Sequence, residues 1–75
     1  MRLSDLQNKD VLYISDGKVI GRIIDVVINE EGNIEKLIVE KYKFLVSMFS
    51  SKDEIEVLWK NIIKIGEDVI LISLE

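Results

Sequence analysis

Hydrophobic and polar residues alternate with a period close to two along much of the chain, and turn-forming residues interrupt this alternation at short intervals. The longest such stretch, VIGRIIDVVINEEGNIEKLIVE (residues 19–40), predicts two strands joined by a turn at residues 29–33. Gly32 suits the positive φ that such a turn requires, whereas Gly21, inside the first strand, predicts a bulge or a sharp bend.

Shorter runs predict further strands. DVLYIS (10–15) ends at Asp16-Gly17, which is a strong signal for a two-residue hairpin. EIEVLW (54–59) alternates acidic and apolar residues, and IKIGEDVILISL (63–74) predicts a hairpin around residues 66–68. Between these two runs, WKNI predicts one tight turn. The middle of the chain is less regular and predicts a short strand around residues 44–47, followed by a turn at residues 50–53.

The N-terminal stretch LSDLQNK predicts a single helical turn. Ser4 is expected to cap it, with Gln7 at the spacing of a capping box, and Leu3 and Leu6 are expected to face inward. About six short strands, turns at intervals of roughly 8 to 12 residues and no long helical period together predict an all-β fold, a small antiparallel barrel. With 75 residues, we expect a single domain spanning residues 1–75.

The amino-acid composition limits the kinds of catalytic and binding site that the chain can form. The chain has no cysteine and no histidine, so it lacks thiolate metal ligands, the commonest imidazole ligand and the commonest general base. Its net charge of -4 disfavours direct binding to nucleic acid. No stretch has the length of a membrane-spanning helix, and the start, MRLSDLQNKD, lacks the apolar core of a secretory signal. We therefore expect a soluble, cytoplasmic protein without membrane insertion, metal or cofactor.

Several carboxylates have both a chemical and a structural interpretation. Asp25 is either a buried acid with a raised pKa or an outward residue paired with Arg22 or a neighbouring lysine, and the alternation favours the outward position. Glu30 and Glu31 do not fit the spacing of a calcium loop, which favours a solvated turn. The acids of SKDEIE (51–56) alternate with aliphatic residues, which favours the outer face of a strand over an acid–base site.

Trp59 and KYKF (41–44) are the aromatic candidates for binding. Trp59 is either a platform on which a ligand stacks or a plug at one end of the barrel, and its place at a strand-to-turn junction favours the plug. KYKF is a weak match to a nucleic-acid platform, which would need several exposed aromatics with basic neighbours.

The order and spacing of four motifs resemble the PRC-barrel family. These are DGKVIG, EEGNI, WKNI and IGEDVIL, and the resemblance covers nearly the whole chain, closest to the small sporulation-associated members from spore-forming bacteria. The chain departs from the family in having Leu58 where relatives place a proline before the tryptophan, and in a middle segment that is glycine-rich in relatives. The resemblance implies an all-β barrel that serves as an adaptor or regulatory module without enzymatic activity, since related domains occur in the photosynthetic reaction-centre H subunit and in a ribosome-maturation factor.

Aliphatic residues occupy both parities of the second predicted strand. Ile20, Ile24, Val26 and Ile28 lie on one parity, and Val19, Ile23 and Val27 lie on the other. One small barrel has a single interior, so the N-terminal turn and central loop, a second copy or another protein should cover the outer face. We expect a twofold dimer through an outer sheet face and the segment FLVSMF, with these candidate interface residues: Phe44, Leu45, Met48 and Phe49.

The function predicted from these observations is a non-catalytic adaptor or regulatory role through protein–protein interaction, associated with sporulation, with a partner that the sequence does not identify. The alternative is a module that binds a small ligand or nucleic acid, for example RNA or the ribosome. An exposed apolar patch would favour the first interpretation, and a concavity ringed by polar groups would favour the second.

Overall fold

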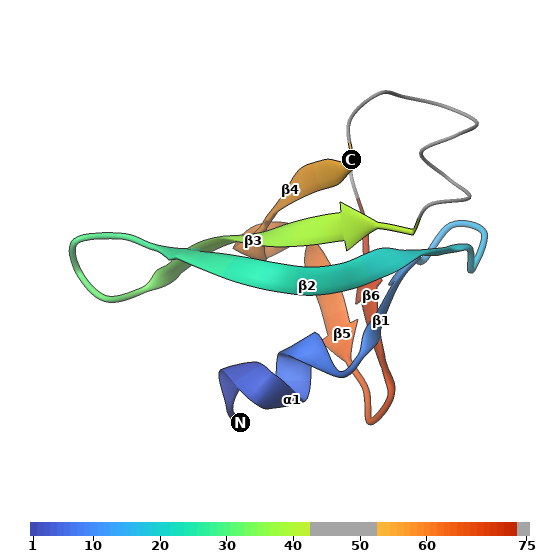
Figure 1. The fold of residues 1–75 in the computed structure, drawn as a ribbon, viewed down its shortest axis with the longest axis horizontal. Helices are drawn as coiled ribbons and strands as arrows, with labels where there is room; N and C mark the ends of the chain where they lie inside the picture. Colours follow the sequence, from blue (N-terminus) through green and yellow to red (C-terminus); the bar gives the residue numbers. More distant parts are fainter. Residues whose placement is uncertain (43–52, 74–75) are drawn as a thin grey trace.

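The computed structural model describes residues 1–42 and 53–73. Six strands, one short helix and one 3-10 turn follow one another in this part of the chain (Figure 1). In chain order they are α1 (Leu3–Gln7), β1 (Asp10–Tyr13), β2 (Val19–Ile28), β3 (Ile34–Lys41), β4 (Glu54–Leu58), η1 (Trp59–Asn61), β5 (Ile62–Ile65) and β6 (Val69–Ile72). The short strand predicted around residues 44–47 lies outside the described residues.

All six strands belong to one sheet in the order β4-β3-β2-β1-β6-β5. Neighbouring strands are antiparallel, as expected, except β1 and β6, which run parallel. The two edge strands, β4 and β5, are joined by the three residues of η1, so the sheet must curl to bring their ends together. Figure 1 shows this curl, with β2 and β3 crossing over β1, β5 and β6. The described sheet stays open between β4 and β5. The predicted all-β fold of about six short strands with one helical turn is confirmed, and the open, curled sheet is consistent with a small β fold of the PRC type.

The core lies inside the curl and consists of aliphatic side chains from the helix and from every strand except β5. Ile70 is the most deeply buried, with no exposed surface. The helix contributes one residue, Leu6, at 3% exposure. The buried set is Leu6, Val11, Ile20, Ile23, Leu37, Val39, Val57, Ile70 and Ile72.

The predicted start of the helix is wrong by two residues. Arg2, rather than Ser4, is the N-cap, and its backbone N–H donates to Asp5 Oδ2 at 2.8 Å. A carboxylate at this position satisfies a free amide of the first turn and lies at the positive end of the helix. The earlier start leaves Leu6 in the core but Leu3 47% exposed, so the prediction that both leucines face inward holds only for Leu6.

Two bulges in β2 explain why the aliphatic residues of that strand do not follow strict parity. Opposite β1, Ile20 is the extra residue, because Val11 pairs with Gly21 and Leu12 pairs with Val19. Opposite β3, the register shifts again between Ile23 and Asp25. Each extra residue reverses the alternation, so Ile20 and Ile23 are both buried although they lie on opposite parities. The bulge expected at Gly21 is confirmed, and the simple division of β2 into two faces is wrong.

Glycines with positive φ close two of the hairpins. Gly32, with φ of 87°, ends the turn between β2 and β3, as predicted. Gly17, with φ of 70°, lies in the loop between β1 and β2, but this loop is longer than two residues. Tyr13 N–H donates to Lys18 O at 3.1 Å, and Gly17 N–H donates to Tyr13 O at 2.8 Å, which leaves residues 14–17 in the loop.

Replacing Gly17 with valine should lower the free energy of unfolding by about 1 to 3 kcal/mol, because a β-branched residue resists positive φ. Chemical denaturation followed by circular dichroism measures the change. Lys18→Val is the matched control, since it places the same side chain at the next exposed position, where φ is not positive. Equal midpoints for Gly17→Val and the wild type would show that the backbone of this loop differs from the one described.

Candidate interaction surface

The strands β1, β5 and β6 carry aliphatic residues on the face that points away from the core. Val11 and Ile70 are buried, and the alternation along each strand therefore turns Leu12 and Leu71 outward. These two residues pair with each other across the parallel ladder, and Leu12 also pairs with Val19 of β2. Since paired residues project from the same face, these side chains form one row across three strands.

The row continues onto β5. Lys64 pairs with Leu71, and Ile63 is the extra residue of a bulge between Ile62 and Lys64. Ile63 is 52% exposed, and we refer to the whole row as the outer strip: Val19, Leu12, Leu71 and Ile63. Val19, Leu12 and Leu71 are half-buried and Ile63 is exposed, and the row crosses β1 and β6 rather than following β2, where the sequence predicted the outer apolar face.

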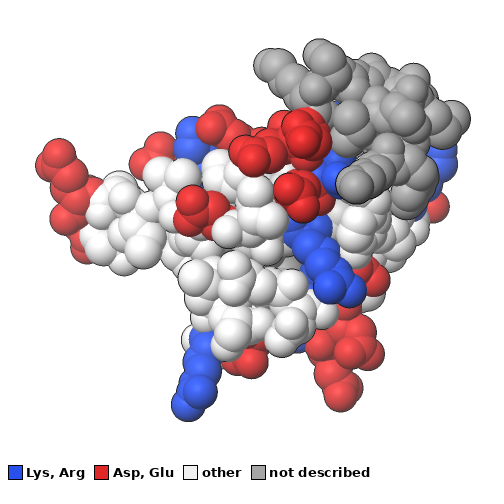
Figure 2. Space-filling view, in the orientation of Figure 1, with Lys and Arg blue, Asp and Glu red and all other residues white. Residues whose placement is uncertain are grey.

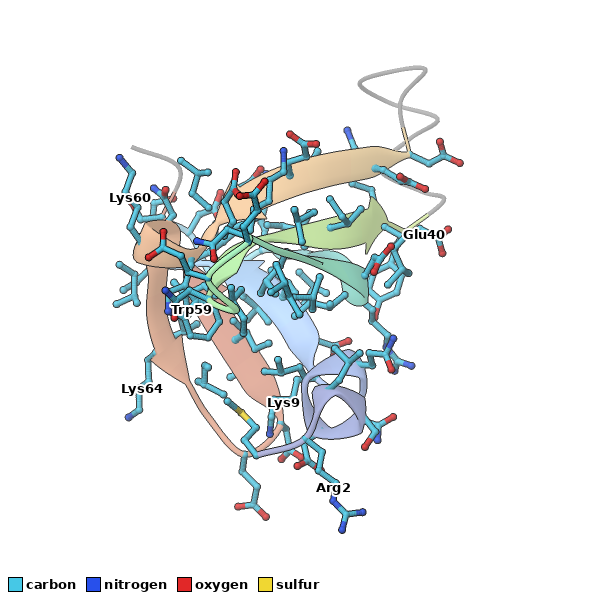
Figure 3. The ribbon with its side chains drawn as sticks, turned by 90° about the vertical axis from the view of Figure 1, so that its left-hand side faces the viewer. Arg2, Lys9, Glu40, Trp59, Lys60 and Lys64 are labelled. Carbon is cyan, nitrogen blue, oxygen red and sulfur yellow. The ribbon has the colours of Figure 1, made fainter. Side chains whose placement is uncertain are left out.

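Two residues border the outer strip. Ile14, 49% exposed, follows β1, and its N–H donates to Ile72 O at 2.9 Å, so the backbone of Ile14 is fixed while its side chain reaches solvent. Lys64 lies at the β5 end, and Figure 3 shows its side chain extending away from the sheet. The strip therefore has an apolar centre and a charged residue at one border.

A polar cluster lies in the neighbouring row of the outer face. Tyr42 donates its hydroxyl proton to Asp10 Oδ1 at 2.5 Å, and Arg22 Nε donates to the Tyr42 hydroxyl at 3.0 Å. Arg22 Nε also lies 3.5 Å from Asp10 Oδ1. The pKa of Tyr42 is raised, first by burial and then by the hydrogen bond to Asp10. The pKa of Arg22 is also raised, mainly by the hydrogen bond that Arg22 donates to Tyr42. The cluster ties β1 and β2 to the residue that follows β3.

Sequence reasoning missed this cluster, because a two-residue turn at Asp16-Gly17 would place Asp10 opposite Ile23, whereas the longer loop and the bulge at Ile20 place it opposite Arg22. The same cluster bears on KYKF, the weak candidate for nucleic-acid binding. The hydroxyl of Tyr42 is already engaged by an acid and by a cation, so it contributes to the structure of the outer face.

Asp25 and the acids of the β2–β3 turn lie at exposed positions of the hairpin. Asp25 is exposed and accepts a hydrogen bond from Val26 N–H at 2.8 Å, so the outward interpretation is confirmed, although Arg22 bonds to Asp10 instead. Glu30 and Glu31 are also exposed. Asn29 Oδ1 accepts from the amides of residues 31 and 33, both at 3.0 Å, which makes this segment the solvated turn that was predicted.

The acids of β4 lie on its outer face, as predicted. Glu54 and Glu56 are exposed and alternate with the half-buried Ile55 and the buried Val57. Glu56 Oε1 accepts a hydrogen bond from Lys36 Nζ of the adjacent strand at 2.9 Å. One of these acids is therefore paired with a cation.

Trp59 does not fill the barrel, so the predicted plug is wrong. Its side chain is 38% exposed and lies in η1, at the end of the sheet that faces the viewer in Figure 3. Val57, two residues earlier, occupies the core position that the alternation along β4 provides. Because the backbone leaves the strand at Leu58, Trp59 no longer follows that alternation.

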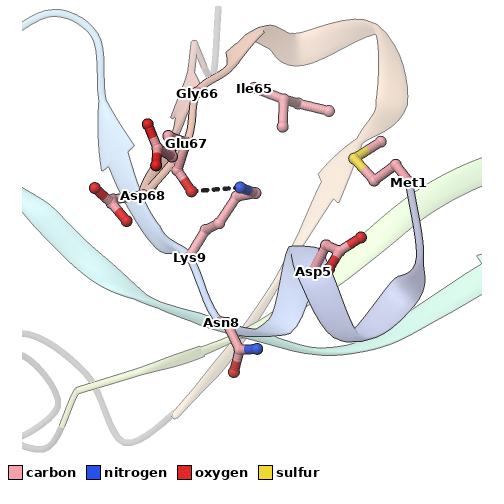
Figure 4. A pocket seen from close by; sticks show the side chains of 8 residues that line it. All are labelled: Met1, Asp5, Asn8, Lys9, Ile65, Gly66, Glu67 and Asp68. Carbon is pink, nitrogen blue, oxygen red and sulfur yellow. Dashed lines mark hydrogen bonds between the residues drawn. The ribbon is translucent and has the colours of Figure 1, made fainter.

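An open depression of about 440 Å³ lies between α1 and the turn from β5 to β6 (Figure 4). Lys9 Nζ donates to Glu67 O at 2.5 Å across this depression. The carboxylates of Asp5, Glu67 and Asp68 line the rest of it, together with Met1, Asn8, Ile65 and Gly66. Lys9, the one lysine of its described lining, already has a partner, and the three carboxylates repel anions.

Residues 1–42 and 53–73 contain no group of three or more His, Cys, Asp or Glu residues that could hold a metal ion. Within the same ranges, no helix has both the length and the apolar character needed to cross a membrane. The candidate interface residues Phe44, Leu45, Met48 and Phe49 lie outside the described part of the chain.

Comparison with known proteins adds two findings. A family model described as "PRC-barrel domain" matches residues 1–74. The chain is also similar to a Bacillus subtilis (strain 168) protein named "Probable sporulation protein YlmC", with 41% identity over 73 residues that cover 96% of this chain and 90% of the relative.

Proposed function

This chain belongs to the PRC-barrel domain family, and from that premise we propose that it is a non-catalytic adaptor that acts in sporulation by holding another protein. The observation that carries the proposal is the outer strip. It places a row of aliphatic side chains on one face of the sheet, with Ile63 exposed and Val19, Leu12 and Leu71 half-buried, and apolar residues gathered on a surface favour protein binding. The process is proposed from the printed name of the Bacillus subtilis relative.

The depression beside α1 has a polar lining, but its acids disfavour the alternative function in binding nucleic acid or an anionic small ligand. The depression beside α1 is open, and three carboxylates line it. Phosphate groups would be repelled there, and the net charge of -4 acts in the same direction. An apolar strip combined with an acidic depression fits protein binding better than nucleic-acid binding.

Co-purification from the native host during sporulation, under mild salt, tests the adaptor role. The wild-type chain should retain a partner in stoichiometric amount, and Ile63→Glu should lose it, because a charge in a desolvated contact lacks a counterion. Ile28→Glu is the matched control: Ile28 is 59% exposed but lies at the far end of β2, outside the strip. If both variants retain the partner equally well, the outer strip is not the contact surface.

We propose a second copy of the chain as the alternative occupant of the outer strip, in a twofold dimer that forms when no partner protein is bound. Closed twofold pairing is the commonest arrangement by which a soluble chain covers an apolar face. In sedimentation equilibrium, the wild type and Ile28→Glu should behave as dimers, and Ile63→Glu should behave as a folded monomer. A wild type that remains monomeric at all accessible concentrations would contradict the dimer while leaving the adaptor role to the co-purification result.

A further inference from the structure

The open edge of β4 is a second surface, separate from the outer strip. β4 is the end strand of the sheet, and β3 is its one ladder partner among the described residues. Lys41 N–H donates to Asp53 O at 2.6 Å, immediately before β4 begins. In an antiparallel ladder, hydrogen-bonded pairs alternate with pairs whose amides point away. The backbone groups of Glu54, Glu56 and Leu58 therefore point toward the open edge.

A depression of about 520 Å³ lies over β3 and β4 beside this edge, and its described lining has two kinds of side chain. Ile38 and Ile55 supply apolar surface, and Glu54 and Glu56 supply carboxylates. A strand that paired with β4 would therefore have two different environments for alternate side chains. On the outer face it would meet Glu54 and Glu56, and on the other face it would lie beside Ile55.

The charges at this edge favour a cationic occupant. Glu40 lies directly opposite Glu54 in the β3–β4 register, and like charges in that position destabilise a strand pair. Asp53, next in the chain, is also exposed. Lys36 is bonded to Glu56, which leaves Glu40, Asp53 and Glu54 as the acids of this edge that no ion pair of the described residues neutralises. Figure 2 shows acidic side chains gathered over β4.

The same charges oppose pairing between two β4 edges. In a twofold β4–β4 ladder, the glutamates of one copy would face those of the other, and edge charges of this kind are a known defence against self-association. A second copy bound through β4 is therefore disfavoured. The acids would instead attract a different chain that carries lysine or arginine.

We propose that the edge of β4 binds an extended segment of a partner protein in which Lys or Arg alternates with aliphatic residues. The segment adds to the sheet as a strand, with its cations toward Glu40, Glu54 and Glu56 and its aliphatic side chains toward Ile55. Backbone hydrogen bonds hold the segment to the edge, and the alternation selects its sequence. This inference goes beyond the proposed function, because it gives the adaptor a second surface with a stated partner chemistry.

A fluorescently labelled peptide with four Lys-Val repeats is the probe, and its anisotropy on titration with the protein gives the affinity at physiological salt. Two peptides serve as comparisons: one with the same composition but paired lysines and paired valines, and one with four Glu-Val repeats. The alternating basic peptide should bind at least about tenfold more tightly than the paired one. The Glu-Val peptide should not bind.

Protein variants locate the site. Glu54→Lys/Glu56→Lys should weaken binding of the alternating peptide by about tenfold or more. Glu30→Lys/Glu31→Lys is the matched control, because it makes the same change of charge in the exposed β2–β3 turn, away from the edge. In amide NMR spectra of the complex, the signals of residues 54, 56 and 58 should shift and become protected from exchange. Ile63→Glu should leave peptide binding unchanged, which separates this test from that of the outer strip.

Three results would overturn the proposal. Equal affinity for the alternating and the paired peptide would show general charge attraction without strand addition. Equal weakening by the β4 variant and the turn variant would show that net charge, rather than this edge, determines binding. Absence of binding to any basic peptide would mean that the acids serve to protect the edge.

Discussion

Replacing Gly21 with alanine should lower the free energy of unfolding by about 4 kcal/mol, which removes most of the stability expected for a domain of this size. A Cβ atom at this position would lie 1.8 Å from the carbonyl oxygen of Glu40 and 2.9 Å from the Cα atom of Lys41. These are backbone atoms of the paired strand β3, so no change of side-chain rotamer relieves the overlap. The two strands would have to separate where Gly21 pairs with Lys41.

Chemical denaturation of the Gly21→Ala protein, followed by circular dichroism, measures this loss. Gly32→Ala is the control, since Gly32 has positive φ but no atom within 4 Å of an added Cβ. We expect that control to lose about 1 kcal/mol through backbone strain alone. Similar losses for the two variants would mean that β2 and β3 do not approach so closely.

The second large effect is expected for Ile70→Ala, which should lower the free energy of unfolding by about 3 to 4 kcal/mol. Ile70 is 0% exposed and lies in β6, between β1 and β5, so its removal leaves a cavity lined by residues of several strands. Ile28→Ala deletes the same atoms from a side chain that is 59% exposed and should cost less than about 1 kcal/mol.

Thermal and chemical unfolding of these two alanine variants decide where the core lies. A midpoint for Ile70→Ala close to that for Ile28→Ala would place the packed interior elsewhere. The wild-type protein should unfold in one cooperative transition, as small single cores do.

Local signals predicted the strands and turns well. Asp16-Gly17 and residues 29–33 mark hairpins because glycine adopts positive φ at little steric cost, and both glycines do so. The alternation in EIEVLW likewise identified β4 and its outer acids. These signals depend on neighbouring residues and can therefore be read without knowledge of the fold.

Features that depend on distant pairing could not be predicted in the same way. The bulge opposite β3 arises where Ile23 and Asp25 pair with consecutive residues of that strand, and no residue type in β2 marks it. The parallel pairing of β1 with β6 joins strands from the two ends of the described chain without a connecting turn. The outer strip depends on this parallel ladder and on the bulges opposite β1 and in β5, which explains why its apolar excess was predicted but its location was not.

Trp59 and Leu3 illustrate a third limit. Each was assigned inward because it is large and apolar and lies near the end of an element. The backbone changes direction at those ends, at Arg2 before α1 and at Leu58 before η1, and the periodicity of the element no longer applies. A shift of one or two residues in a boundary is enough to turn such a side chain toward solvent.

The parallel ladder between β1 and β6 also has a consequence for the order of folding. The hairpins of β1, β2 and β3 can form from contacts close in sequence, whereas β1 gains its second neighbour only after β6 is available. Non-local pairing of this kind slows folding, to times on the order of milliseconds to seconds in small β proteins. During synthesis, the ribosome releases β6 last of the six strands, so β1 emerges with an unpaired edge that is open to aggregation. A chaperone that protects this nascent chain would therefore be expected to act at β1.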